Sequence, residues 1–230
     1  MKKVLSLVSA FALALSLTSC GGSGLTAMDA ADYVQGLLDA TYLGVFHQEY
    51  LAGVNLTEEE AQTNYENGLE VEYEYFTYYF DISTDDLTEQ THNAIVDLLA
   101  DIYQQSAYQV KTVSRMDDGF VVEVVVEPID IIPLVAENYM EAYSADFATN
   151  YADVDLAAIG EVEQEAFRLT YENDWATGIV ELFRAHLDEL GHLEGESILA
   201  QFLPNEDGAY CLSDADFSNI DALVLAYSYR

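Results

Sequence analysis

The spacing of hydrophobic residues changes repeatedly along this 230-residue chain, and this change constrains the fold more than any other feature. Apolar side chains first recur every three or four residues, as on one face of a helix, and then alternate or run continuously, as in strands. The resulting order is helices, strand pair, helices, strand pair and a last helix. Because single strands and helices do not alternate, this order predicts an α+β fold rather than a parallel α/β fold.

The two strand pairs have clear hairpin signals. Residues 108–115 and 120–127 are rich in β-branched side chains, and the four residues between them end in Asp-Gly, a strong turn signal. A second pair is expected over 196–203 and 209–212, again with Asp-Gly at the end of the turn. These antiparallel hairpins either join in one sheet or serve two separate lobes.

Capping residues mark the first two long helices. Thr26 and Asp29 have the spacing of a capping box, and Thr57 and Glu60 repeat it at the start of a strongly acidic segment. Residues 69–75 also alternate as a half-buried strand would. The cap and the length of the pattern favour a helix there.

Four further helices are expected. Capping residues predict helix starts at 83–86 and Ser213, proline in a first turn predicts one at Pro133, and renewed helical spacing predicts one near Asp155. The helix that starts at Pro133 should continue through Phe147. Asn173 and Asp174 mark either a break or a bend in the next helical region, which Gly191 should end.

The repeated order of elements suggests a degenerate tandem duplication. The joint between the two copies would lie near residues 129–133. The first copy, over 28–128, would contain a helical segment and a hairpin, and the second, over 129–230, would contain the same elements and a C-terminal helix. The chain is long enough for one large domain or two small ones with an apolar core. The two segments are therefore expected to fold as two domains or to pack as one.

The N-terminus has the pattern of a bacterial lipoprotein signal. Two lysines precede a short apolar run, and Leu17-Thr18-Ser19-Cys20 follows it. This predicts a signal peptide over residues 1–19, a diacylglycerol group on the Cys20 sulfur and a flexible tether over 20–27, rich in glycine. The expected location is the extracytoplasmic face of the cell membrane, with the membrane contacted through the lipid on Cys20.

The charge of the chain restricts its partners. It has 42 acidic and 7 basic residues, which gives a formal net charge of −35 at pH 7. Such a surface disfavours nucleic acid and anionic headgroups and attracts cations, polyamines and basic protein patches. We expect an envelope protein, peptide or glycan as the partner, and no nucleic acid. If Cys20 is acylated, Cys211 has no partner for an internal disulfide.

Three parts of the sequence resemble uncharacterised lipoproteins of gut Clostridia: the motif ending at Cys20, the segment 28–42 and the acidic segment 57–80. The resemblance extends over most of the chain after the signal. It implies a cell-surface lipoprotein of a Gram-positive-type bacterium. Cys20, as the lipid acceptor, is the one functional residue that it carries over.

Catalytic motifs do not stand out in the sequence. The four histidines have no metal-ligand spacing, and the chain lacks the nucleophile-elbow, phosphate-loop and dinucleotide glycine patterns. We therefore expect a protein that is not an enzyme and that holds no cofactor. The alternative is a carboxylate-dependent enzyme of the cell envelope, because acidic pairs are abundant.

Two groups of residues are candidates for binding. Tyr75, Tyr78 and Tyr79 could form a surface on which a sugar or peptide stacks, or could pack one side into the core. Asp153 and Asp155 could supply oxygen ligands to calcium, as in a calcium-binding surface protein, although helix capping also explains such residues. The leading hypothesis is a lipid-anchored module that binds a ligand or a protein.

Overall fold

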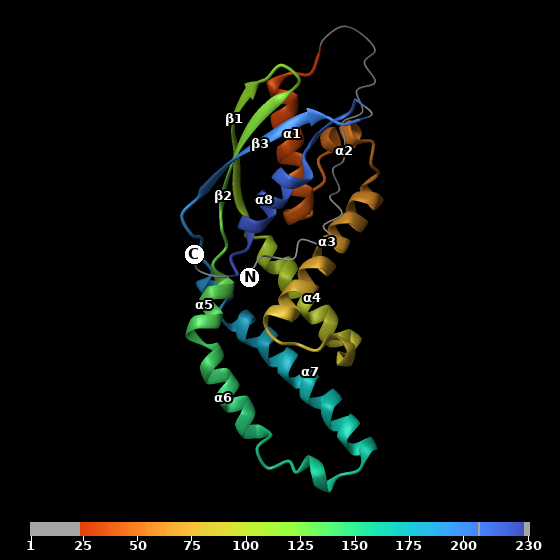
Figure 1. Ribbon diagram of the computed structural model, residues 1–230, viewed down its shortest axis with the longest axis vertical. Coiled ribbons are helices and arrows are strands. Elements are labelled where there is room, and N and C mark those ends of the chain that lie inside the picture. Colours follow the sequence, from red (N-terminus) through yellow and green to blue (C-terminus); the bar gives the residue numbers. More distant parts are fainter. Residues whose placement is uncertain (1–23, 207, 228–230) are drawn as a thin grey trace. The chain divides into compact units, whose positions relative to one another are not determined.

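The computed structural model describes residues 24–206 and 208–227 (Figure 1). The expected signal peptide over residues 1–19 and the expected lipid acceptor Cys20 lie outside these residues. Among the described helices, none has both the length and the apolar character needed to cross a bilayer.

Helices and strands follow one another in the order expected of an α+β fold. From residue 24 to the first hairpin, the structure contains four α-helices, a π-helical turn and a 3₁₀ turn: α1 (Ala27–Leu38), η1 (Asp39–Leu43), α2 (Gln48–Val54), α3 (Glu58–Tyr79), η2 (Thr84–Asp86) and α4 (Glu89–Tyr103). The hairpin and the helices after it are β1 (Ala107–Arg115), β2 (Phe120–Glu127), α5 (Ile131–Asn138), α6 (Met140–Asn150), η3 (Leu156–Ala158), α7 (Glu161–Ala185) and η4 (Leu187–Glu189). The chain ends with β3 (Glu196–Pro204), β4 (Tyr210–Leu212) and α8 (Asp214–Val224).

Both hairpins belong to one antiparallel sheet with the strand order β1-β2-β3-β4. The register places Val122 opposite Val113 on one side and Ala200 on the other, and a bulge interrupts β1 between Val110 and Val113. Every second side chain of β2, starting at Phe120, is buried. Helices α1 and α8 pack against these strands, so this face of the sheet forms part of the apolar core (Figure 1).

The described chain divides into two compact units, each built from separate stretches of sequence. The first unit contains residues 24–71, 103–129 and 192–225, and with them the whole sheet. The second unit contains mainly residues 72–102 and 130–191 and is helical. Helix α3 contributes to both, because the division falls between Val71 and Glu72.

The second unit has an aromatic core. Phe183 of α7 is fully buried, and its ring centroid lies 5.3 Å from those of both Phe76 and Phe80. Aromatic side chains also fill the space between α6 and α7: Tyr143, Phe147 and Tyr151 meet Phe167, Tyr171 and Trp175 with ring centroids about 5–6 Å apart. Apolar rings therefore link two helices whose exposed faces are largely polar.

The structure confirms the two predicted capping boxes. The backbone N–H of Asp29 donates to Thr26 Oγ1, and the Asp29 carboxylate accepts from the Thr26 N–H at 2.8 Å. Glu60 and Thr57 repeat this arrangement at the start of α3. Residues 69–75 belong to α3, which confirms the helix predicted there rather than the alternative strand.

Three predicted helix boundaries are wrong. Residues 83–86 do not cap α4: the Asp86 carboxylate is buried against Arg168, and Thr88 caps the helix by accepting from the N–H of Thr91 at 3.2 Å. The helix expected to run from Pro133 through Phe147 is interrupted at Tyr139, which separates α5 from α6.

The third error is the end of α7. The helix stops at Ala185, and a 3₁₀ turn follows before Gly191. Within α7, Asn173 and Asp174 form no break, because the helix is continuous through them. Asn173 has a different role, since its side-chain amide nitrogen donates to the backbone oxygen of Asp86 at 2.8 Å.

Candidate functional site

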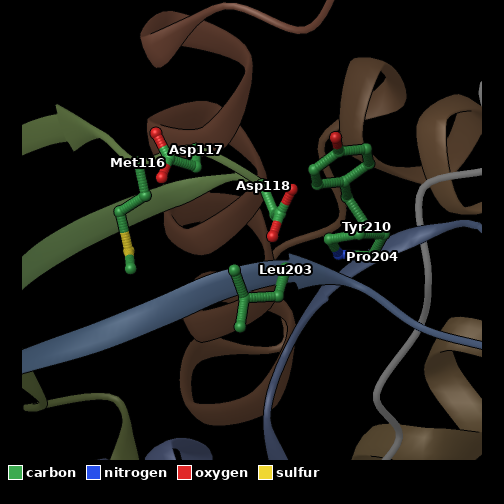
Figure 2. Close-up of a pocket in the computed structure, with 6 residues that line it drawn as sticks. All are labelled: Met116, Asp117, Asp118, Leu203, Pro204 and Tyr210. Carbon is green, nitrogen blue, oxygen red and sulfur yellow. The ribbon is translucent and has the colours of Figure 1, made fainter.

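A hollow of about 590 Å³ lies at one end of the sheet in the first unit. It is lined by the β1–β2 turn and by the paired ends of β3 and β4: Met116, Asp117, Asp118, Leu203, Pro204 and Tyr210 (Figure 2). Its volume is in the range of small-molecule sites, and its lining combines apolar, aromatic and acidic side chains. We therefore take this hollow as the candidate binding site.

The strand order explains why these residues meet. In an antiparallel sheet of four consecutive strands, the β1–β2 turn and the β3–β4 turn lie at the same end. The first turn is closed by a hydrogen bond of 2.8 Å from the N–H of Met116 to the oxygen of Gly119. The second is closed by a bond of 2.8 Å from the N–H of Asn205 to the oxygen of Ala209. The first turn and the strand ends next to the second turn thus line the hollow.

Gly119 allows the first turn to pack directly on β3. A Cβ atom at this position would lie 2.3 Å from the carbonyl oxygen of Phe202, which is part of the sheet backbone and cannot rotate away. The backbone φ of Gly119 is not positive, so glycine is required here by space rather than by a left-handed conformation. This contact fixes the distance between the turn and the floor of the hollow.

The aromatic wall of the hollow is the ring of Tyr210, which packs against buried aromatic side chains of the core. The Tyr210 ring centroid lies 5.7 Å from that of Phe202, which is fully buried. Phe202 in turn lies 4.8 Å from the ring of Tyr33, and Tyr33 lies 5.9 Å from Tyr50. Burial raises the pKa of both Tyr33 and Tyr50, so the two phenols stay neutral. A connected series of rings therefore supports the wall from the core.

The acidic side chains of the hollow are free to meet a ligand. Asp117 and Asp118 are exposed, and neither carboxylate forms a hydrogen bond or an ion pair with the part of the chain that the structure describes. The neighbouring Arg115 directs its guanidinium to the Phe120 ring, 5.8 Å from the centroid. In Figure 2 the Asp118 carboxylate lies near Leu203 and Tyr210, whereas Asp117 lies beside Met116.

The three tyrosines predicted to bind a ligand lie on α3 with different surroundings. Tyr78 is 74% exposed and Tyr79 is 38% exposed, while Tyr75 is half-buried. The rings of Tyr75 and Tyr79 both meet the edge or face of Tyr227, at 4.4 and 5.1 Å. Two of the three rings therefore pack against Tyr227, and Tyr78 is the most exposed of the three.

The two aspartates predicted to bind calcium are exposed in the loop between α6 and α7. Asp155 caps the 3₁₀ turn η3, where its carboxylate accepts from the N–H of Ala157 at 3.0 Å. Within residues 24–206 and 208–227, no three or more His, Cys, Asp or Glu side chains converge as metal ligands. The structure does not bring a third such ligand to Asp153 and Asp155.

A second polar cluster is centred on Asp39, in the π-helical turn η1. Asp39 Oδ1 accepts hydrogen bonds from Gln35 Nε2 and the Tyr108 hydroxyl, each at 2.8 Å. Asp39 Oδ2 lies 2.7 Å from His47 Nε2. Asp39 as a residue is 8% exposed, and the burial of Tyr108 together with the Asp39 carboxylate raises the pKa of Tyr108. Three protein partners surround Asp39, so its role is to join α1, β1 and the residue before α2.

Sequence reasoning placed both turns correctly but did not identify the hollow. The Asp-Gly signals locate the turns, whereas the sequence pattern marks Leu203 and Tyr210 only as strand residues. The missing information was that β2 pairs with β3, since this pairing brings the two turns together. No residue type in the hollow gives a catalytic or metal-binding signature on its own.

The fold has a counterpart among solved structures. It is similar to YcdA of Bacillus subtilis strain 168, a protein provisionally described as a lipoprotein, with a TM-score of 0.58 and 14% identity. The similarity covers 86% of this chain and 56% of the YcdA chain, so this chain spans little more than half the length of that protein. At this identity the likeness shows the fold alone. The sequence itself matches no protein-family model and none of the curated proteins.

Proposed function

We propose that this protein is a lipid-anchored binding module on the extracytoplasmic face of a bacterial membrane, and that it holds its ligand in the hollow between the two hairpin turns. The observation that carries this proposal is the hollow itself, with its braced aromatic wall and its unpaired acidic rim. The lipoprotein-type N-terminus ending at Cys20 supports the anchoring, as does the fold shared with a protein described as a lipoprotein.

The architecture of the hollow suits binding rather than turnover. Its polar side-chain groups are two carboxylates on a turn and the hydroxyl of Tyr210, without a histidine, serine or cysteine among the lining residues. The buried Asp39 carboxylate, which lies beside His47, belongs to the structural cluster described above. We therefore favour a binding module over a carboxylate-dependent enzyme.

Anchoring is tested by replacing the lipid acceptor. In a Gram-positive host, the full chain should incorporate a labelled fatty acid and remain with the membrane fraction. The Cys20→Ser variant should incorporate none, because serine lacks the sulfur that carries the diacylglycerol. Cys211→Ser is the matched control and should keep its label. Equal labelling of the wild type and the Cys20→Ser variant would contradict the anchor.

Binding is tested by thermal unfolding of the full chain in detergent against envelope peptides, sugars, amines and divalent cations at matched ionic strength. A ligand present at about 100 times its dissociation constant stabilises the folded state by about 2.7 kcal/mol. Tyr210→Ala should remove this stabilisation, whereas Tyr78→Ala, which removes an exposed ring elsewhere, should not. A ligand that binds both variants as it binds the wild type would place the site outside the hollow.

A further inference from the structure

We propose that the group bound in the hollow is an organic cation of one kind: a primary ammonium at the end of an aliphatic stem, as in a lysine side chain or a polyamine. This inference rests on the proposed function and specifies its ligand. It follows from how the acidic and apolar side chains of the hollow are arranged, rather than from the acidity of the whole surface.

The first step concerns charge. Asp118 and Asp117 bring two carboxylates to the rim, and the lining residues include no arginine, lysine or histidine. The nearest basic residue in sequence, Arg115, lies over the Phe120 ring. A cationic ligand therefore gains charge-assisted hydrogen bonds to these carboxylates that an anionic or uncharged ligand does not form.

The second step concerns shape and polarity. Figure 2 shows the Asp118 carboxylate close to the side chains of Leu203 and Tyr210, so an acidic oxygen and an apolar wall face the same space. A hydrated metal ion gains nothing from Leu203, Pro204 and the ring of Tyr210. An alkylammonium uses all of them, because its methylene groups cover apolar surface while its charged end meets the carboxylate and the aromatic face.

The third step concerns rigidity. Gly119 packs on the Phe202 carbonyl, and Phe202 also supports the Tyr210 ring. The acidic turn and the aromatic wall are therefore fixed to the same residue of β3. A site whose charged and apolar parts are held at a constant separation binds a stem of suitable length without a large loss of conformational freedom.

The test is isothermal titration calorimetry on the full chain in detergent, at about physiological ionic strength, with three probes. Acetyl-Gly-Lys-Gly-amide and spermidine represent the peptide and polyamine sources of the ammonium. Acetyl-Gly-norleucyl-Gly-amide is the control, because it keeps the aliphatic stem and lacks the charge. We expect at least one ammonium probe to bind and the norleucine peptide to bind at least about fivefold more weakly.

Two aspartate variants separate a specific site from the general acidic field. Asp118→Asn and Asp153→Asn remove the same charge, and both residues lie on exposed turns or loops. We expect Asp118→Asn to weaken binding of the ammonium probe by about five- to tenfold and Asp153→Asn to leave it within about twofold. Equal weakening by the two variants would overturn the proposal, as would calcium binding that depends on Asp118 in place of the amine.

Failure of this inference is distinguishable from failure of the proposed function. If an uncharged envelope ligand binds and Tyr210→Ala abolishes that binding, the hollow is a binding site and the cation proposal is wrong. If no ligand depends on Tyr210, the binding function of the hollow is wrong as well. If spermidine binds and the lysine peptide does not, the ligand is a free amine rather than a peptide.

Discussion

Replacing Phe202 by alanine should lower the free energy of unfolding by about 4 kcal/mol, because it removes a fully buried ring and leaves a cavity between the sheet and α1. The same change should weaken ligand binding in the hollow. The ring centroids of Phe202 and Tyr210 lie 5.7 Å apart, so without the Phe202 ring the Tyr210 side chain loses its packing partner and samples other orientations. Thermal or denaturant unfolding measures the first effect, and calorimetric titration below the unfolding transition measures the second.

Phe183→Ala is the matched control for this experiment. Phe183 is also fully buried, but it lies in the aromatic core of the second unit, against Phe76 and Phe80. We expect a similar loss of about 4 kcal/mol with binding unchanged in the folded protein. If both variants lose binding to the same degree, the effect comes from general destabilisation, and Phe202 has no particular role in supporting the hollow.

The comparison of Phe202 with Phe183 also shows what could be predicted from the sequence. Both residues have the spacing of buried positions, one in an alternating strand and the other in a helical pattern, so their burial follows from the period alone. The residues that contact Phe202 and Phe183 cannot be predicted from the period. Phe202 meets Tyr33 from a segment about 170 residues earlier in the chain, and no local pattern specifies such a contact.

The errors at helix ends have a related cause. Ser83 through Asp86 have the composition of a helix cap, and Thr88 has it as well. The structure selects Thr88 because Arg168 and Asn173 of α7 bind the earlier turn and hold it as a 3₁₀ helix. Tertiary contacts thus decide between two local signals of similar strength. The same holds for the hollow, whose two turns were recognisable but whose proximity depends on the pairing of β2 with β3.

Replacing Asp39 by alanine should lower the free energy of unfolding by about 3 kcal/mol, because it removes a buried carboxylate and leaves three hydrogen-bonding partners unsatisfied. Asp39→Asn should cost clearly less. Its amide oxygen still accepts from Gln35 and Tyr108, and its amide nitrogen can donate to Nε2 of a neutral His47. Denaturant unfolding of the two variants at pH 7 measures the difference.

Asp101→Ala is the control for the loss of a charge, since Asp101 forms an exposed ion pair with Arg184 at 2.8 Å. Its removal should cost less than about 1 kcal/mol. A cost for Asp39→Ala no larger than that of Asp101→Ala would show that the buried cluster adds little to stability. In that case the hydrogen bonds of Asp39 would not account for the π-helical turn in which it lies, and π-helical turns are often found at functional sites. The larger cost is expected because Asp39 is the residue through which α1, β1 and the start of α2 are joined.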